Sequence, residues 1–257
     1  MSKKIFYLTG TFRCGTTLLR SILNQNPDFY VTPNSILPNV FWLLDRFKKE
    51  TSYKNWKKVD VDKQYLNSEK YYDNIIKNIF NNYFSEHKQK YILEQGRWGT
   101  LDNFNLLKKY NLLPAKFILL VRPFDEILSS WIRVDNVSND SIYQYCNFLM
   151  SPMGQIGQAA LALKFLVDNH KNNLLIIKYK DLCKQPEKTV KKIYKFLNVP
   201  CYKKHRFNNL NQVDISGSMH TTIRTKEIKQ IHYNDLKIPT EIVKMYKKER
   251  DLFNKYG

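Results

Sequence analysis

The sequence predicts a three-layer α/β/α protein, with a central parallel sheet between two layers of helices. Short apolar runs bounded by turn residues alternate with longer segments of helical spacing, which is typical of repeated βα units. The strongest run, AKFILLV at 115–121, is apolar on both faces, as a strand inside a parallel sheet requires. The first apolar run enters a glycine turn and then a helix, in LTGTFRCGTTLLRSIL at 8–23. That order is the P-loop-like strand-loop-helix of phosphate-binding proteins.

The remaining elements follow from the same patterns. We expect strands at 3–9, 90–95, 115–121 and 172–179, with a short strand or loop at 29–33. We expect helices at 16–27, 36–47, 101–110, 124–134, 185–200 and 239–255. A further helical stretch at 141–170 is interrupted near Ser151-Pro152.

Residues 48–90 interrupt the βα alternation with a segment rich in Lys, Asn, Tyr and Asp. Apolar positions at helical spacing predict a helix at 69–84, and the rest of the segment, 50–68, is expected to be a loop. We interpret 48–90 as a helical insertion over the sheet and 201–257 as a loop-rich tail with a closing helix. The length fits one domain covering 1–257.

The chain is strongly basic, with a formal net charge of +19. The lysines and arginines are spread along the sequence, which favours solubility and attraction to anionic ligands over a nucleic-acid interface. None of the usual nucleic-acid-binding motifs is present in the sequence, so nucleic acid is not the expected partner.

Three further features describe the environment that we expect for the chain. No apolar run reaches the roughly 18 residues of a membrane-spanning helix. The segment MSKKIFYLTG lacks the apolar region and cleavage site of a secretory signal, so we expect a cytoplasmic protein. Four cysteines without C-x-x-C spacing predict neither a zinc site nor a disulfide framework.

The loop at 9–17 is the first candidate site. Gly10 and Gly15 have the glycine spacing of a Walker A loop, but two threonines, Thr16 and Thr17, stand where that motif has Lys-Ser/Thr. Backbone N–H groups, a helix N-terminus and the Arg13 side chain all favour an anion. No strand ends in an aspartate suited to magnesium, so the site is expected to bind anions without a metal. The structural alternative is a turn that needs glycine only for its geometry.

The second candidate site is VRPFDEILSS at 121–130. Arg122 follows the strongest strand, where its guanidinium can make forked hydrogen bonds to a phosphate. Ser130 comes eight residues later, so a short loop and helix can return it towards the same anion. The alternative is that Arg122 only pairs with Asp125 or Glu126.

Together these stretches resemble the sulfotransferases that use 3′-phosphoadenosine 5′-phosphosulfate (PAPS). RCGTT at 13–17 is similar to their 5′-phosphosulfate loop, and Arg122 with Ser130 matches their 3′-phosphate motif. A third segment, at 176–200, resembles their strand that ends in Tyr before a helix. The resemblance covers 3–33 and 90–200, and it implies transfer of a sulfuryl group from PAPS without magnesium. It implies these donor-binding residues: Gly10, Arg13, Cys14, Gly15, Thr16, Thr17, Arg122, Ser130, Tyr179 and Arg224.

The resemblance also implies that Arg13 is catalytic and that a base takes the proton from an acceptor hydroxyl or amine. Relatives place a histidine after a strand, but the corresponding stretch here, ILEQGRWG at 92–99, has none. Glu94 is therefore the first candidate for the base, and His220 is the second.

The acceptor is not specified by the sequence. The basic composition points to an anionic sugar or glycan, and three tryptophans are candidates for stacking on a sugar ring: Trp42, Trp98 and Trp131. For Trp131, on the apolar face of its predicted helix, core packing is the preferred interpretation. Two other functions stay open, a P-loop kinase or NTPase with an atypical loop and a non-enzymatic anion- or nucleic-acid-binding module.

Overall fold

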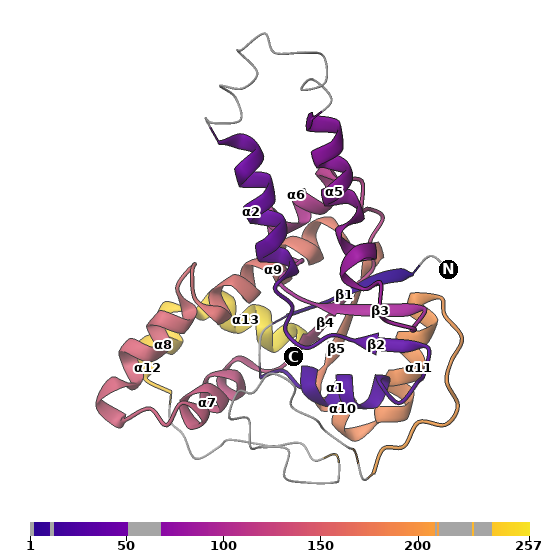
Figure 1. Cartoon of the computed structure of the whole chain (residues 1–257). Coiled ribbons are helices and arrows are strands. Elements are labelled where there is room, and N and C mark those ends of the chain that lie inside the picture. Colours follow the sequence, from indigo (N-terminus) through magenta and orange to yellow (C-terminus); the bar gives the residue numbers. More distant parts are fainter. Residues whose placement is uncertain (1–2, 11–12, 51–67, 209, 211–227, 229–237) are drawn as a thin grey trace.

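The computed structural model describes residues 3–10, 13–50, 68–208, 210, 228 and 238–257. Its five-stranded sheet is parallel throughout. In the order β2-β3-β1-β4-β5, the strands are β2 (Phe29–Val31), β3 (Tyr91–Gln95), β1 (Lys4–Gly10), β4 (Phe117–Val121) and β5 (Leu174–Lys178). Because β1 lies between β3 and β4, the segment after β1 begins between the carboxyl ends of both neighbours (Figure 1).

Helices cover both faces of the sheet, and a third group lies beyond the carboxyl ends of the strands (Figure 1). One face carries α1 (Thr16–Leu23), α10 (Tyr179–Lys184) and α11 (Pro186–Leu197). The opposite face carries α2 (Leu37–Lys49), α5 (Ser68–Tyr83), α6 (Leu101–Lys109) and α9 (Gln155–Asn169). The third group comprises α7 (Phe124–Val134), α8 (Ile142–Met150), α12 (Thr240–Met245) and α13 (Lys247–Tyr256), and two 3₁₀ turns lie at Asn139–Ser141 and Lys171–Asn173. The predicted three-layer α/β fold is confirmed.

The core explains why these segments are strands and helices. Every residue of β4 is buried, as its two-sided apolar sequence requires. An aromatic cluster joins the strands to the helices above them: Tyr7, Phe41, Phe80, Trp98 and Phe117. Trp98 is fully buried in this cluster, so the expectation that it stacks on a sugar is wrong. Trp42 is about half exposed and stays a candidate.

The predicted insertion contains α5, which confirms the helix expected at 69–84. The loop expected at 50–68 lies almost entirely outside the described residues. α5 runs beside α2, where the Tyr72 hydroxyl donates a hydrogen bond of 2.8 Å to the Leu44 carbonyl. At the other end of α5, Phe80 is buried against Tyr7 with ring centroids 5.9 Å apart. The C-terminal half of α5 therefore belongs to the core.

Two helical predictions differ from the structure. The strand expected at 172–179 ends at Lys178, and the short helix α10, which was not predicted, begins at Tyr179; α11 then begins at Pro186, where the proline ring suits a first helical turn. The closing helix expected at 239–255 is two helices, α12 and α13, which meet at Tyr246.

Asp45 on α2 is a buried carboxylate that ties α2 to α6. It accepts a hydrogen bond of 2.8 Å from the Tyr110 hydroxyl and forms ion pairs with Lys49, at 2.7 Å, and with Lys109. Burial alone would raise the pKa of Asp45, but the hydrogen bonds from Lys109, Lys49 and Tyr110 hold it at about 2. The folded state therefore favours the ionised carboxyl.

Replacing Asp45 with asparagine should destabilise the protein at pH 7 by about 2 kcal/mol, because the folded pKa lies below that of an unfolded aspartate. This contribution is complete above pH 4 and is lost as the pH falls towards 2, so the difference between variant and wild type should shrink at pH 3. Urea unfolding at both pH values measures it. Asp28→Asn is the control, since Asp28 forms a half-exposed ion pair. An equal loss at pH 7 and pH 3 would contradict the assignment.

Among the described residues, no helix combines the length and the apolar character that a membrane span requires.

Candidate active site

The segment between β1 and α1 has an unusual backbone. Three described residues here have positive φ: Gly10, the last residue of β1, at 133°, Arg13 at 71° and Gly15 at 92°. A Cβ at Gly10 would lie 2.9 Å from the Leu120 carbonyl oxygen, and one at Gly15 would lie 2.6 Å from the Tyr179 ring. Both glycines are therefore needed for close packing as well as for φ. Arg13 tolerates the left-handed region only because its surroundings hold it there.

The N-terminus of α1 is left open to a ligand. Gly15 is the N-cap, no side chain caps the helix and no acidic residue lies in its first turn. The first backbone N–H groups of α1 thus have the geometry and the partial positive charge that an anion prefers. Thr16 and Thr17 lie in this turn. The Cys14 side chain is fully buried and burial raises its pKa to about 12, so Cys14 can offer a ligand only its backbone.

The two sequence motifs meet in space. Arg13 Nε donates a hydrogen bond of 3.1 Å to Ser130 Oγ on α7. Arg122 Nη1 donates one of 3.3 Å to the Arg13 carbonyl oxygen. Residues 13 and 122, from the ends of neighbouring strands, therefore border one site, as the parallel sheet predicts.

Arg122 is oriented by two neighbours. Its Nε lies 2.7 Å from Glu126 Oε2, and its guanidinium lies 4.5 Å from the centre of the Tyr179 ring. From the sequence, Arg122 was expected to pair with Asp125 or Glu126 if it did not bind a phosphate. In the structure it pairs with Glu126, whereas Asp125 pairs with Arg250 of α13 at 3.1 Å. Tyr179 contacts both motifs, because the same ring also packs against Gly15. Pairing with Glu126 does not exclude a phosphate, since a guanidinium has five donors.

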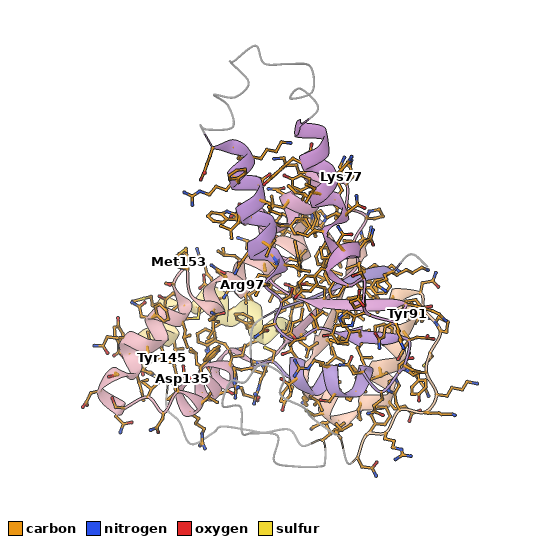
Figure 2. All side chains as sticks on the ribbon, in the orientation of Figure 1. Lys77, Tyr91, Arg97, Asp135, Tyr145 and Met153 are labelled. Atoms are coloured by element: carbon orange, nitrogen blue, oxygen red, sulfur yellow. The ribbon has the colours of Figure 1, made fainter. Side chains whose placement is uncertain are left out.

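The positive charge of Arg13 also acts on Tyr145 of α8. The pKa of Tyr145 is raised mainly by burial and by Asp135, while the Arg13 guanidinium acts in the opposite direction. Figure 2 shows Tyr145 and Asp135 side by side among the helices beyond the strand ends, where the Tyr145 hydroxyl donates a hydrogen bond to Asp135.

Glu94 is fully buried near the end of β3, on the sheet face that carries Tyr7. Its Oε2 accepts a hydrogen bond from the Trp98 indole, and the Ser35 hydroxyl also favours the ionised carboxyl. Burial raises the pKa of Glu94 to about 7, which is a useful value for a general base. In this conformation solvent does not reach the carboxyl, so contact with an acceptor requires a local movement.

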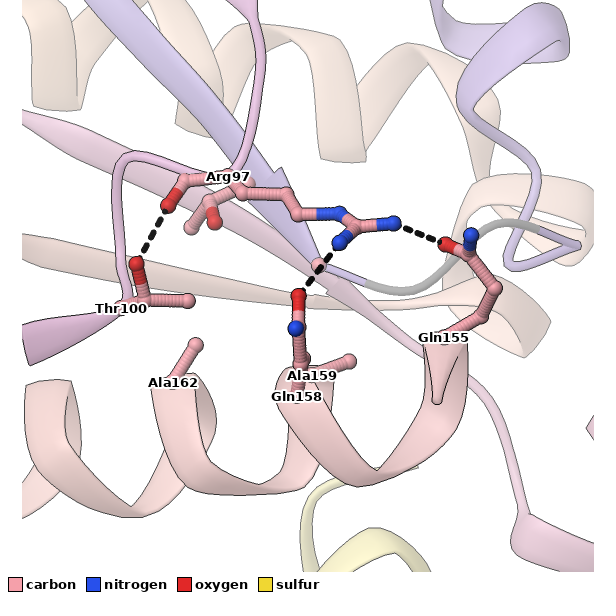
Figure 3. A pocket seen from close by; sticks show the side chains of 8 residues that line it. Arg97, Thr100, Gln155, Gln158, Ala159 and Ala162 are labelled. Carbon is pink, nitrogen blue, oxygen red and sulfur yellow. Dashed lines mark hydrogen bonds between the residues drawn. The ribbon is translucent and has the colours of Figure 1, made fainter. Parts of the chain in front are cut away.

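A small pocket opens beside the loop, on the face of the sheet covered by α9. It is lined by Thr9, Gly10, Arg97, Thr100, Gln155, Gln158, Ala159 and Ala162. Arg97 reaches across it and donates hydrogen bonds to the side-chain oxygens of Gln155 and Gln158 (Figure 3). Sequence reasoning missed Arg97, although its position directly after a strand end was a signal.

A family model described as the sulfotransferase family matches residues 6–204, a range that includes both motifs. The chain belongs to the sulfotransferase family. A search of curated protein sequences finds no match.

Solved sulfotransferase structures share the fold across nearly the whole chain. The sulfotransferase domain of the Synechococcus PCC 7002 olefin synthase has a TM-score of 0.64 at 15% identity, covering 98% of this chain and 95% of that one. The sulfotransferase domain from the curacin biosynthetic pathway has a TM-score of 0.56 at 15% identity, with 96% and 97% covered. The sulfotransferase from Alicyclobacillus acidocaldarius has a TM-score of 0.55 at 13% identity, with 98% and 92% covered.

In this sulfotransferase, α13 holds the N-terminus of α7. Asn254 Oδ1 accepts a hydrogen bond of 3.1 Å from the Phe124 backbone N–H, and Arg250 pairs with Asp125. These contacts fix the helix that carries Ser130, and sequence reasoning missed them because they join residues about 130 positions apart.

Two predicted site residues, His220 and Arg224, lie outside the described residues. Within the described ranges, His, Cys, Asp and Glu side chains form no group of three or more that could hold a metal ion.

Proposed function

We propose that this sulfotransferase moves a sulfuryl group from PAPS to a hydroxyl or amine of an acceptor by metal-independent in-line transfer. The observation that carries the proposal is the hydrogen bond from Arg13 to Ser130. It joins one residue from each anion-binding motif, so a single doubly phosphorylated nucleotide can contact both.

The proposal assigns a role to each side of the site. The N–H groups from Gly10 to Thr17, the hydroxyls of Thr16 and Thr17 and the Arg13 guanidinium bind the 5′-phosphosulfate. Arg122 and Ser130 bind the 3′-phosphate, with Arg224 as a further contact. Tyr179 supports both sides, because its ring contacts Gly15 and lies against Arg122. Anchoring the nucleotide at both ends positions its reactive group, which lowers the entropic part of the barrier.

When bound, PAPS supplies a sulfuryl group whose sulfur–oxygen bond to the 5′-phosphate breaks as the acceptor bond forms. Arg13 and the α1 N-terminus stabilise the negative charge that develops on the leaving oxygen. A base accepts the proton that the acceptor loses. Glu94 is the first candidate, supported by a pKa of about 7, and His220 is the second.

Melting curves test the donor assignment. With adenosine 3′,5′-bisphosphate at one hundred times its Kd and EDTA present, we expect about 2.7 kcal/mol of added stability and thus a rise in Tm of roughly 5–10 °C. ATP with magnesium is the comparison. A shift only with ATP and magnesium would favour a kinase or NTPase, and no shift with the bisphosphate would contradict the proposal.

A further inference from the structure

Arg97 lies at the carboxyl end of the sheet, beside a strand end to which no donor-binding role has been assigned. It follows β3, whereas Arg122 follows β4, and β1 with its loop lies between these two strands. Arg97 lines the same pocket as Thr9 and Gly10, at the end of β1. The pocket therefore borders the start of the phosphate loop from the side opposite to Arg122, near the middle of the molecule (Figure 2).

The charge of Arg97 has no carboxylate partner among the described residues. Its guanidinium is hydrogen-bonded to two neutral side-chain oxygens, those of Gln155 and Gln158. The buried guanidinium of Arg122, in contrast, pairs with Glu126. Arg97 is half-buried, and burial lowers its pKa, although a guanidinium remains charged in proteins. A partly desolvated cation without a counter-ion is costly unless an anion completes the site.

The rest of the pocket also favours an anion. Gln155 and Gln158 each direct the side-chain oxygen towards Arg97, which leaves their amide N–H groups as donors (Figure 3). Gln155 is the first residue of α9, whose first turn contains no acidic residue. The positive end of this helix therefore adds to the charge of Arg97. Ala159 and Ala162 supply only small side chains to the lining, and the cavity of about 10 Å³ beside Arg97 has room for about one oxygen atom of a ligand.

We propose that Arg97 binds an anionic oxygen group of the acceptor, so that this sulfotransferase acts on a substrate that already carries a carboxylate or sulfate. The inference rests on the proposed function. The donor has two anionic ends, and the roles proposed for Arg13 with α1 and for Arg122 with Ser130 account for both. Arg97 is a third cation, just after the other neighbouring strand, and it shares a pocket with Thr9 and Gly10 at the end of β1.

The competing explanation is that Arg97 only ties the turn after β3 to α9. Such a tie holds whether or not an anion is present, and it predicts no preference between charged and neutral ligands. An anion site predicts a preference that depends on the charge at position 97. The two explanations therefore differ in ligand binding, which can be measured without knowing the natural acceptor.

Two matched pairs of probes test the proposal: 4-hydroxyphenylacetate against its amide, and D-glucuronate against D-glucose. Each is titrated by calorimetry or ligand-observed NMR into full-length protein saturated with adenosine 3′,5′-bisphosphate in low salt. We expect at least one acid to bind roughly 10-fold or more tightly than its neutral partner. The preference for the acid should disappear in Arg97→Met. It should persist in part in Arg97→Lys, because lysine keeps the charge but lacks the forked donors of a guanidinium.

The wild-type comparison alone can overturn the proposal, even if a variant folds poorly. If neither acid binds better than its neutral partner, Arg97 does not bind an anionic acceptor. The same holds if the preference survives in Arg97→Met. Failure of the bisphosphate to bind wild-type protein would instead contradict the donor assignment, so the two results are distinguishable. Lys164 is exposed and lies on α9, the helix that carries Gln155 and Gln158. Lys164→Met is the control for a general loss of positive charge.

Discussion

Replacing Arg122 with methionine should remove most of the affinity that the 3′-phosphate contributes to nucleotide binding. A charge-assisted hydrogen bond contributes about 1.5–3 kcal/mol, so the Kd for adenosine 3′,5′-bisphosphate should rise roughly 10- to 100-fold. The Kd for adenosine 5′-monophosphate, which has no 3′-phosphate, should change little. Calorimetric titration of both nucleotides measures the effect, and the ratio of the two Kd values reports the 3′-phosphate alone.

Arg122→Met also breaks the ion pair with Glu126, whose side chain is only 18% exposed, so the variant could lose stability as well as affinity. A substitution of Glu126 controls for this effect. Glu126→Gln removes that ion pair but keeps Arg122, so its affinity for the bisphosphate should remain within a few-fold of wild type. The double variant Arg122→Met/Glu126→Gln separates lost binding from lost folding, since it removes both charges of the ion pair together. If Glu126→Gln weakens the bisphosphate as much as Arg122→Met does, Arg122 acts only through its ion pair.

Replacing Arg13 with methionine should have the complementary effect on the 5′-group. The Kd for the bisphosphate should again rise about 10- to 100-fold, while that for adenosine 3′-monophosphate should change less. Arg13→Lys should retain part of the affinity, because lysine restores the charge but not the forked donor. Arginine, lysine and methionine are all unbranched at Cβ, so the strain of the φ of 71° at this position should be similar in the three proteins.

The result that would contradict the role of Arg13 is an equal loss of affinity for the 5′-phosphorylated and the 3′-phosphorylated mononucleotide. That pattern would mean that Arg13 shapes the loop as a whole. A further measure is transfer of labelled sulfuryl groups once an acceptor is known, where loss of one donor to a developing oxyanion costs about 10²–10³ in kcat.

Much of the fold could be predicted because local patterns and tertiary structure agree in the sheet. The strands at 90–95 and 115–121 and the helices at 101–110 and 124–134 lie within two residues of their predicted bounds. In each, the apolar spacing that defines the element is also the surface that it buries. The interruption predicted near Ser151-Pro152 is confirmed, since α8 ends at Met150 and α9 begins at Gln155.

Other features depend on contacts between distant residues, which spacing does not encode. Tyr246, which separates α12 from α13, donates a hydrogen bond to Asn147 on α8. Trp98 is of a residue type that often stacks on ligands, but it is buried against Phe41 and Phe80. The motif residues Arg13 and Ser130 could be named from sequence, yet their hydrogen bond depends on how α7 lies across the end of the sheet.

The contact between Arg13 and Ser130 has a consequence for how a nucleotide enters. The serine oxygen accepts this bond and keeps its own O–H, which can donate to an incoming phosphate while the contact with Arg13 persists. A fragment that shifts either side chain therefore also affects its partner in the other motif. The halves of the ligand are thus thermodynamically linked through the protein, and their separate affinities need not sum to that of the intact molecule.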